Sequence, residues 1–515
     1  MRNGRTGWAA AGIIGLWVAA ATWRLGWPGL QFDEVLFAVW LYPTEQAARA
    51  PWIDRLMLMP YMGALKAWIY GLWLPAAGNT AWAVRLPMVV LAAATLGLIF
   101  GAVRRAVPGR AALVLLALAA GDPLYLLTSR YDWGPVVLQR LCLWGALGVL
   151  LGGRSAPRAL LAGLLAGVGL FDKLSFHWLL LAAVATAALV YPRELWVRAK
   201  SGAPAAGLGG FLLGSWPVWL YRWAGRRSEP VTLETDWGAL EGKLSLVRNA
   251  LSGEPLNGWI AHSYLEPEMQ ELGPPAWLAF SDWGASGWLG WVAAVSLAAL
   301  AALWLRRGEA GALRCERAAA ACVIFCALAA AQMMAVQGAG YLHHWALVAP
   351  VPQLGMGFVG MALWERRRWR GWLLGLLASV LAAQGLALAR QYYAIAEYGG
   401  RPAWSEAIFP LAEELRERAP EHVVALDWGI EVPLRLLSAG RLPTLAVSRD
   451  EDLRHWLAEP GDRLFVGYLP GVPDLFEAAE PRFAAAAGEL GLTVEEVGRV
   501  RDRQGREIFG VWRVR

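Results

Sequence analysis

Two adjacent carboxylates, Asp33 and Glu34, follow the first apolar stretch of the chain, at residues 8–27. Carboxylates at the mouth of a bilayer are costly to desolvate and contribute nothing to membrane insertion. The pair therefore favours a site that uses negative charge at the membrane surface, and the competing interpretation is a solvated loop.

Four more charged residues stand at the ends of later apolar stretches: Arg85, Arg130, Asp132 and Lys173. Converging cations at a water-poor site would stabilise an anion. The alternative for each cation is snorkelling to lipid headgroups or anchoring a loop. Asp132 either contacts a substrate or pairs with Arg130 or Arg140 to hold its loop.

A further polar cluster, Tyr341, His343 and His344, stands at the start of another apolar stretch. Adjacent histidines point two ways from a helix and make a poor bidentate metal site. Interfacial packing is the favoured interpretation, and substrate contact is the alternative.

The elements that must position these residues cross a membrane. Apolar residues make up 57% of the chain and charged residues 17%, with 31 Trp, which is far from the composition of a soluble protein. The net charge of +6 is spread over short clusters instead of one aromatic-lined basic patch, so a nucleic-acid partner is not expected. The sequence predicts an α-helical polytopic membrane protein.

Hydropathy predicts about eleven crossings, each long enough to span a bilayer. They lie at about 8–27, 84–103, 111–128, 134–152, 158–172, 175–191, 204–221, 287–305, 318–336, 343–362 and 371–390. The arginine clusters between them fall on one side, which the positive-inside rule assigns to the cytoplasm. The N-terminus is then cytoplasmic, and its apolar stretch is expected to stay as a helix, because it is too long for a cleaved signal.

Two long outer loops follow from this topology, at about 28–82 and 222–286. Residues 53–75 are apolar enough to be mistaken for a crossing, but counting them would place the arginine clusters outside. They are therefore predicted to lie along the outer surface as interfacial helices. The four cysteines fall in apolar spans or a cytoplasmic loop, so no outer disulfide framework is implied.

After about residue 392 the composition changes. Strands are predicted at 423–426, 464–467 and 508–514, and helices at 450–457 and 473–490. The chain thus divides into a transmembrane domain, 1–392, and a small α/β domain, 393–515, long enough to hold its own core. An odd number of crossings places the second domain outside the cytoplasm.

Several short motifs, in order, resemble the ArnT-like and protein-mannosyltransferase-like glycosyltransferases of the GT-C superfamily, of the family 39 or 83 type. They are Asp33-Glu34, Gly78 through Arg85-Leu86-Pro87, Asp122-Pro123 with Ser129-Arg130-Tyr131-Asp132, and Gly167-Val168-Gly169-Leu170-Phe171-Asp172-Lys173. The resemblance implies a GT-C fold and an acidic catalytic motif in the first outer loop. It also implies a polyprenyl-phosphate-linked sugar donor, used at the outer face of a bacterial cytoplasmic (inner) membrane.

The resemblance gives these residues roles. A base must take the proton of the attacking hydroxyl; Asp33 is the candidate, with Glu34 orienting it or the acceptor and Asp132 as the second acidic position. Lys173, Arg130 and Arg85 are candidates for binding the donor phosphate. Tyr341, His343 and His344 are candidate substrate contacts.

One departure from the family concerns the donor cation. Aminoarabinose transferases carry Lys-Pro in the first outer loop, where this chain has Met59-Pro60, so transfer of aminoarabinose to lipid A is in doubt. Lys66 is the nearest basic substitute for phosphate binding, and its alternative is an interfacial helix position facing headgroups.

Two other classes of function compete with sugar transfer. A transporter or flippase of a lipid-linked glycan would show ionisable residues midway through several spans and a repeated half, and neither is evident. A membrane scaffold would leave Asp33, Asp132 and Lys173 without a shared purpose. The sequence names neither the sugar nor the acceptor, which is a lipid, a glycan or a protein. No cofactor is required, and a carboxylate pair can bind Mg²⁺ or Mn²⁺ or act without a metal.

Overall fold

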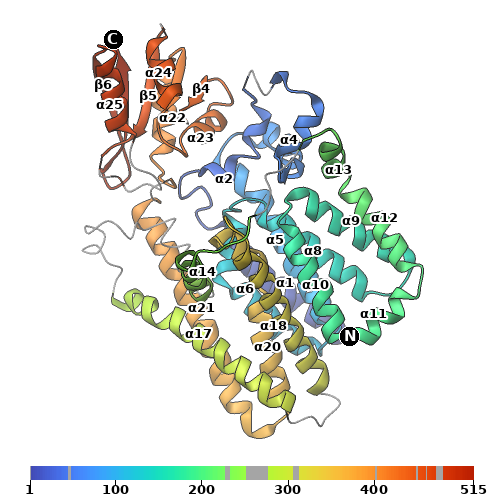
Figure 1. Ribbon diagram of the computed structural model, residues 1–515. Helices are drawn as coiled ribbons and strands as arrows, with labels where there is room; N and C mark the ends of the chain where they lie inside the picture. The colour runs from blue at the N-terminus through green and yellow to red at the C-terminus, as the bar shows by residue number, and fades with distance from the viewer. Residues whose placement is uncertain are drawn as a thin grey trace.

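The computed structural model describes residues 2–44, 48–226, 232–250, 276–305, 312–400, 403–447, 450–459, 461–470, 472 and 479–515. Its larger part is a bundle of helices with a long first loop at one end (Figure 1). A smaller part with a β-sheet, residues 403–515, lies at the same end as this loop, and the N-terminus lies at the opposite end. This smaller part is called the C-terminal domain below.

The first half of the bundle contains α1 (Arg2–Thr22), α5 (Ala81–Val103), α6 (Gly109–Gly121), α7 (Pro123–Arg130), α8 (Val136–Leu151), α9 (Ala156–Asp172), α10 (Phe176–Val190), α11 (Pro192–Ala199), α12 (Ala203–Gly214) and α13 (Trp216–Trp223). The second half contains α14 (Trp237–Ala250), α17 (Ala276–Leu305), α18 (Ala312–Ala335), α19 (Leu342–Trp345), η3 (Ala346–Val348), α20 (Val351–Trp364), η4 (Arg367–Trp369) and α21 (Arg370–Tyr398). Each predicted crossing coincides with one or more of these helices.

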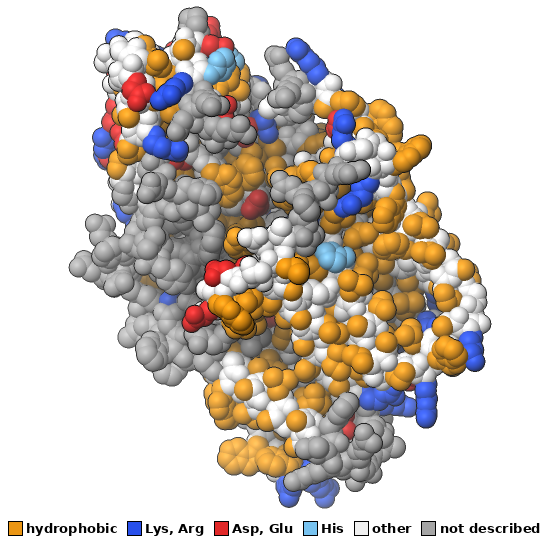
Figure 2. Space-filling model, in the orientation of Figure 1, with side chains coloured by type: hydrophobic (Ala, Val, Ile, Leu, Met, Phe, Trp, Pro, Cys, Tyr) orange, Lys and Arg blue, Asp and Glu red, His pale blue; other side chains and the backbone are white. Residues whose placement is uncertain are grey.

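Within the described residues, four helical segments are long and apolar enough to cross a membrane: Ala81–Val103, Arg314–Ala335, Leu342–Trp364 and Arg367–Tyr398. Counting two bent helix pairs as single spans raises the number to six. The shorter apolar helices are Val136–Leu151, Ala203–Gly214 and Trp288–Ala302. Figure 2 shows hydrophobic side chains covering the helical part on the face in view, with Lys and Arg side chains at its lower end. The structure therefore has several apolar helices, and the count of about eleven crossings stays a prediction.

The bend between α6 and α7 measures 58° and has a local cause. The Asp122 side chain accepts hydrogen bonds from the backbone N–H groups of Leu124 (2.9 Å) and Tyr125 (3.3 Å). Pro123 occupies the first helical position, where its missing N–H costs nothing. A new helix therefore starts at this point, and its last residue is Arg130.

The first loop folds into short elements: α2 (Phe32–Val35), η1 (Val39–Leu41), η2 (Trp52–Leu56), the hairpin of β1 (Met57–Met59) and β2 (Met62–Gly63), and α4 (Leu65–Ala77). Met62 of this hairpin pairs with Lys173 in an isolated antiparallel bridge. The loop is thereby fixed to the end of α9, which brings the first and the last of the sequence motifs together.

The C-terminal domain contains α22 (Ile408–Arg418), β3 (His422–Ala425), α23 (Glu431–Leu437), β4 (Thr444–Ala446), α24 (Asp450–Ala458), β5 (Arg463–Tyr468), α25 (Glu480–Glu489), β6 (Val494–Arg501) and β7 (Glu507–Val514). The sheet order is β4-β3-β5-β7-β6, with β3 parallel to β4 and β5, and β7 antiparallel to β5 and β6. Alternate residues of β3 enter two cores, since Val423 packs with α22 and α23 and Val424 packs with α24 and α25. Helices therefore cover both faces of the sheet.

The C-terminal domain packs directly on the first loop. Trp404, Val432 and Leu436 are buried in the same hydrophobic core as the helices of the bundle. The backbone N–H of Gly29 donates to the carbonyl oxygen of Trp404 at 2.8 Å, and a Cβ on Gly29 would overlap the carbonyl of Ser405. This close approach requires glycine at position 29.

Candidate active site

The short helix α2 presents the two adjacent carboxylates to different surroundings. The Gln31 side chain caps this helix by accepting hydrogen bonds from the N–H groups of Asp33 (2.7 Å) and Glu34 (3.2 Å). Glu34 is fully buried, whereas Asp33 is half-buried. Neighbouring residues of identical chemistry are thus separated into an inner and an outer carboxylate.

Glu34 forms a buried ion pair with Arg85, which lies near the start of α5. The guanidinium makes two contacts with the carboxylate, Nε to Oε1 at 2.6 Å and Nη2 to Oε2 at 2.9 Å. Its remaining N–H groups donate to the carbonyl oxygens of Leu25, Pro28 and Gly29. A buried pair of this geometry holds the first loop onto α5.

Asp132 likewise forms an ion pair, with Lys66 of α4. The Lys66 Nζ lies 2.7 Å from Asp132 Oδ2, and both side chains are buried. The other carboxylate oxygen of Asp132 accepts from the N–H of Val137 at 3.0 Å. Asp132 has a positive φ of 33°, a conformation that a non-glycine residue adopts only under constraint from its surroundings.

Arg130 donates its hydrogen bonds to backbone carbonyl oxygens of the protein. Its guanidinium is buried and donates to one carbonyl oxygen in the last turn of α1, that of Ala21, and to three that follow the helix, those of Trp23, Arg24 and Trp27. Arg140, which the sequence analysis weighed as a partner of Asp132, instead donates to Thr128, Ser129 and Ala346. Both arginines therefore hold helix ends and loops together in this structure.

Asp33 contrasts with these paired groups. Its Oδ2 accepts a hydrogen bond from the indole Nε1 of Trp133 at 2.9 Å, and within the described residues it makes no ion pair. The Trp133 ring packs edge-on to Trp404 and tilted against His343, with ring centroids 6.3 Å and 5.5 Å away. Asp33 is thus an oriented carboxylate with part of its surface exposed.

Lys173 supplies a cation to the same place. It follows the last turn of α9, and its backbone carbonyl accepts from Gln139 at 3.0 Å. Burial lowers the pKa of its ammonium, and the negative charges of Asp33 and Asp172 oppose this shift. Among the described residues the ammonium has no hydrogen-bond or ion-pair partner, and it faces the Tyr61 ring at 6.0 Å. Its charge is therefore available to an anion.

The two histidines and Tyr341 border this site. His343 and His344 lie with ring centroids 4.0 Å apart, and Tyr341 stacks on His343 at 6.1 Å. The Nδ1 atoms of both histidines are buried without a hydrogen-bond partner among the described residues. His343 contacts Trp133, so it lies next to the tryptophan that orients Asp33.

Aromatic residues of the C-terminal domain reach the same place. Trp428 packs against Phe32, the residue directly before Asp33 in the chain, with ring centroids 5.1 Å apart. Trp404 is fully buried against Tyr131 and Trp133. The surroundings of Asp33 are therefore built from both ends of the sequence.

Three of these contributors were not foreseen from the sequence: Trp133, Trp404 and Trp428. Tryptophan is too frequent in this chain for any single one to stand out. Asp172 stood in the last of the sequence motifs but was given no role; it is a buried carboxylate whose two oxygens have no hydrogen-bond partner among the described residues. A carboxylate at the end of an apolar helix was a usable signal for Asp172.

The candidate carboxylates do not converge as metal ligands. Within the described ranges, no group of three His, Cys, Asp or Glu side chains has the arrangement of a metal site. Glu34 and Asp132 are each bound by a cation, which leaves few oxygen ligands for Mg²⁺ or Mn²⁺.

The helical bundle with its structured first loop matches the GT-C fold, as similarity to solved structures shows. The structure is similar to that of ArnT from Cupriavidus metallidurans bound to undecaprenyl phosphate, with a TM-score of 0.59 and 15% sequence identity over 99% of this chain and 98% of that one. It is also similar to the oligosaccharyltransferase of Archaeoglobus fulgidus in the apo form, with a TM-score of 0.50 and 12% identity over 95% and 69% of the two chains. The complex of that enzyme, AglB, with an inhibitory peptide and a dolichol-phosphate gives a TM-score of 0.51 and 11% identity.

At the level of sequence, residues 62–221 match the family described as dolichyl-phosphate-mannose-protein mannosyltransferase. No curated protein sequence matches the chain significantly. The matched segment contains Lys66, Arg85, Arg130, Asp132 and Lys173 but begins after Asp33. The comparisons confirm the GT-C resemblance that the motifs indicated.

Proposed function

We propose that this protein transfers a sugar from a polyprenyl-phosphate donor to a hydroxyl acceptor at the outer face of the cytoplasmic membrane. The observation that carries the proposal is the contrast among the three acidic candidates. Glu34 and Asp132 are neutralised by Arg85 and Lys66, whereas Asp33 is half-exposed, held by one indole hydrogen bond and within the electrostatic reach of the unpaired Lys173.

The chemistry assigned to these two residues is a single displacement. The Asp33 carboxylate accepts the proton of the acceptor hydroxyl while the hydroxyl oxygen forms a bond to the anomeric carbon. The bond from that carbon to the phosphate oxygen breaks, and its electron pair leaves with the lipid phosphate. The Lys173 ammonium stabilises the negative charge that develops on this phosphate, an effect that is largest in a water-poor site.

The other candidate residues act on this pair indirectly in the proposal. Arg85, Arg130 and Lys66 hold the first loop and the helix ends that carry Asp33 and Asp132. Trp133 fixes the Asp33 carboxylate, and His343 supports Trp133. Phe32 and Trp428 offer aromatic surface beside Asp33, on the side where an acceptor would approach from the C-terminal domain.

Two kinds of similarity support the donor, and a third observation supports the location. ArnT was solved with undecaprenyl phosphate and AglB with a dolichol-phosphate, and both share the fold of this chain. The family that matches residues 62–221 is described by a dolichyl-phosphate-mannose donor. The proposed outer-face location is supported by the Lys and Arg side chains at the lower end of the helical part, opposite the end where α2 lies.

The experiment replaces Asp33 in cells that lack the chromosomal copy of this protein. Lipid extracts of such cells should accumulate a polyprenyl-phosphate sugar, measured by mass spectrometry, and the wild-type chain should clear it. Asp33→Asn removes the negative charge at nearly constant size, so turnover should fall about a hundredfold or more. Asp54→Asn is the matched control, because Asp54 lies in the same loop and pairs with Arg226 at the surface. Clearance by Asp33→Asn as fast as by the wild type would rule out the proposed base.

A further inference from the structure

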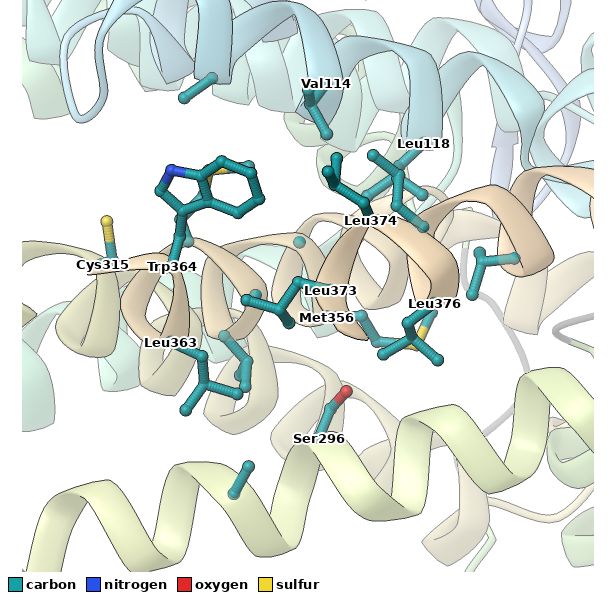
Figure 3. Close-up of a pocket in the computed structure, with 18 of the residues that line it drawn as sticks. Val114, Leu118, Ser296, Cys315, Met356, Leu363, Trp364, Leu373, Leu374 and Leu376 are labelled. Carbon is teal, nitrogen blue, oxygen red and sulfur yellow. The ribbon is translucent and has the colours of Figure 1, made fainter. Parts of the chain in front are cut away.

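A cavity described in the bundle lies away from the candidate active site. A cavity of about 580 Å³ lies between α6, α17, α20 and α21, with Cys315 of α18 at one side (Figure 3). Its volume is within the range of ligand sites in proteins. Figure 3 shows the indole of Trp364 and the side chains of Val114, Leu118 and Leu374 in the space between these helices.

The lining of the cavity changes along its length. Its lining is apolar apart from Arg110, Ser296 and Glu365. Arg110 lies in the first turn of α6, and Glu365 directly follows α20, so both belong to the end of the cavity that these helix termini form. The cavity therefore has an apolar interior and one end lined by charged side chains.

Arginines flank these two residues, Arg110 and Glu365, in the sequence. Arg104 and Arg105 precede α6, and Arg366, Arg367, Arg368 and Arg370 follow Glu365, so Glu365 is the single carboxylate in these two connections. Arg110 itself is exposed, and within the described residues it has no hydrogen-bond or ion-pair partner. A phosphate on an apolar chain would match both parts of this site.

The donor of the proposed reaction does not fit this position. The phosphate of that donor belongs near Lys173, whereas Arg110 stands at the beginning of α6, and α6 runs for 13 residues before the bend at Asp122. A helix of this length separates the two ends by about 20 Å. The arginine end also lies on the same side as the basic loops, where anionic lipid headgroups are attracted.

We infer that an anionic phospholipid binds in this cavity, with an acyl chain between α6, α17, α20 and α21 and its phosphate at Arg110. The site is separate from the transfer reaction and does not depend on it. Its expected role is to fill the seam between the first and second halves of the bundle with a lipid of the arginine-side leaflet.

The test uses the purified full-length chain, delipidated in detergent, and measures lipid binding by native mass spectrometry. The probes are palmitoyl-oleoyl-phosphatidylglycerol and the matching phosphatidylcholine, which carries no net charge. The wild type should bind the phosphatidylglycerol about tenfold more tightly, the effect expected of one charge-assisted contact. Arg110→Gln should remove this preference, and Arg158→Gln, at the start of α9 and outside the cavity, should keep it.

A second pair of variants tests the cavity itself. Gly360 lines it, and a Cβ at Gly360 would have no heavy atom within 4 Å, so Gly360→Leu should fill the space and reduce phosphatidylglycerol binding about tenfold. Gly385→Leu on α21 is the control, with equal free space but outside the lining. Ala299→Phe, also on the lining, is a second filling variant should Gly360→Leu fail to fold.

Three results would overturn the inference. Equal binding of both lipids would mean that no headgroup is recognised. Unchanged phosphatidylglycerol binding in the filling variants would place the lipid elsewhere. Displacement of phosphatidylglycerol by undecaprenyl phosphate, in a manner that depends on Arg110, would assign the cavity to the carrier of the donor.

Discussion

At the scale of single residues, the candidate site contains charged side chains that pair with other protein groups and charged side chains that do not. Glu34 with Arg85 and Asp132 with Lys66 are complete pairs, and Arg130 gives its donors to backbone carbonyls. Asp33 and Lys173 form no ion pair among the described residues, and each is within the electrostatic reach of the other. The sequence identified all of these residues, but pairing between positions 34 and 85, or 66 and 132, depends on tertiary contacts that no local pattern shows.

The first prediction compares two cations that the sequence alone does not distinguish. Lys173→Met should fold normally and bind undecaprenyl phosphate about tenfold more weakly, because the lost interaction is one charge-assisted contact. Arg130→Met should instead destabilise the protein by about 3 kcal/mol, since it leaves several partly buried carbonyl oxygens unpaired. Thermal unfolding and lipid binding of the two purified variants separate these outcomes. Normal stability of Arg130→Met together with weak lipid binding would return Arg130 to the phosphate site.

The second prediction concerns pH. Burial lowers the pKa of Lys173, so its ammonium should lose its proton at a lower pH than the value of about 10.4 usual for lysine. Affinity for undecaprenyl phosphate should therefore fall as the pH rises through this lowered pKa. Because the charge of Asp33 opposes the shift, Asp33→Asn should move the loss of affinity to still lower pH. Lys173→Arg should move it to higher pH, since guanidinium stays protonated. The same pH profile in the wild type, Asp33→Asn and Lys173→Arg would show that Lys173 does not bind the lipid phosphate.

At the scale of elements, the position of Lys173 depends on the packing of α9 against α12. Glycines of the two helices face each other closely: a Cβ on Gly163 would overlap the carbonyl of Gly207, and one on Gly210 would overlap the carbonyl of Leu160. Small residues permit such close approach of helices in membranes. Hydropathy located these helices, but their mutual contact was not foreseen, because small residues serve many purposes in apolar segments.

The third prediction tests this contact. Gly210→Leu should force α9 and α12 apart and lower the free energy of unfolding by about 1–3 kcal/mol, the usual cost of overpacking. Gly209→Leu is the matched control, because a Cβ at Gly209 meets no heavy atom within 4 Å. Since α9 ends next to Lys173, binding of undecaprenyl phosphate should weaken only in Gly210→Leu. Equal thermal stability of both variants would show that the contact is not needed.

At the scale of the whole molecule, the C-terminal domain is part of the site that the first loop presents. Trp404 supports Trp133, Trp428 packs on Phe32, and Gly29 donates to the Trp404 carbonyl. The sequence predicted strands at the positions of β3, β5 and β7 but missed β4 and β6. The strand β4 has three residues, and β6 contains Glu495, Glu496, Arg499 and Arg501, so neither has the apolar run that marks a buried strand.

The fourth prediction tests the contact between the domain and the loop. Gly29→Val should prevent close docking on Ser405 and reduce sugar transfer on the order of a hundredfold, because Asp33 would be displaced relative to its partners. Helix content by circular dichroism should stay unchanged, while amide exchange in the first loop should rise. Gly26→Val is the control, since a Cβ at Gly26 meets no heavy atom within 4 Å. Full activity of Gly29→Val would show that the loop and the domain work independently.

The contact between Gly29 and Trp404 also sets an order in time. A ribosome adds about 5–20 residues per second, so the segment that closes over Asp33 follows it by on the order of a minute or less. During that interval the nascent chain has its carboxylates and its first helices, but it lacks Trp404, which packs against Trp133, and Trp428, which packs against Phe32. A chain released early by the ribosome would therefore be inserted in the membrane and yet inactive. In the proposed mechanism, catalytic competence begins only when the C-terminal domain has folded against the first loop.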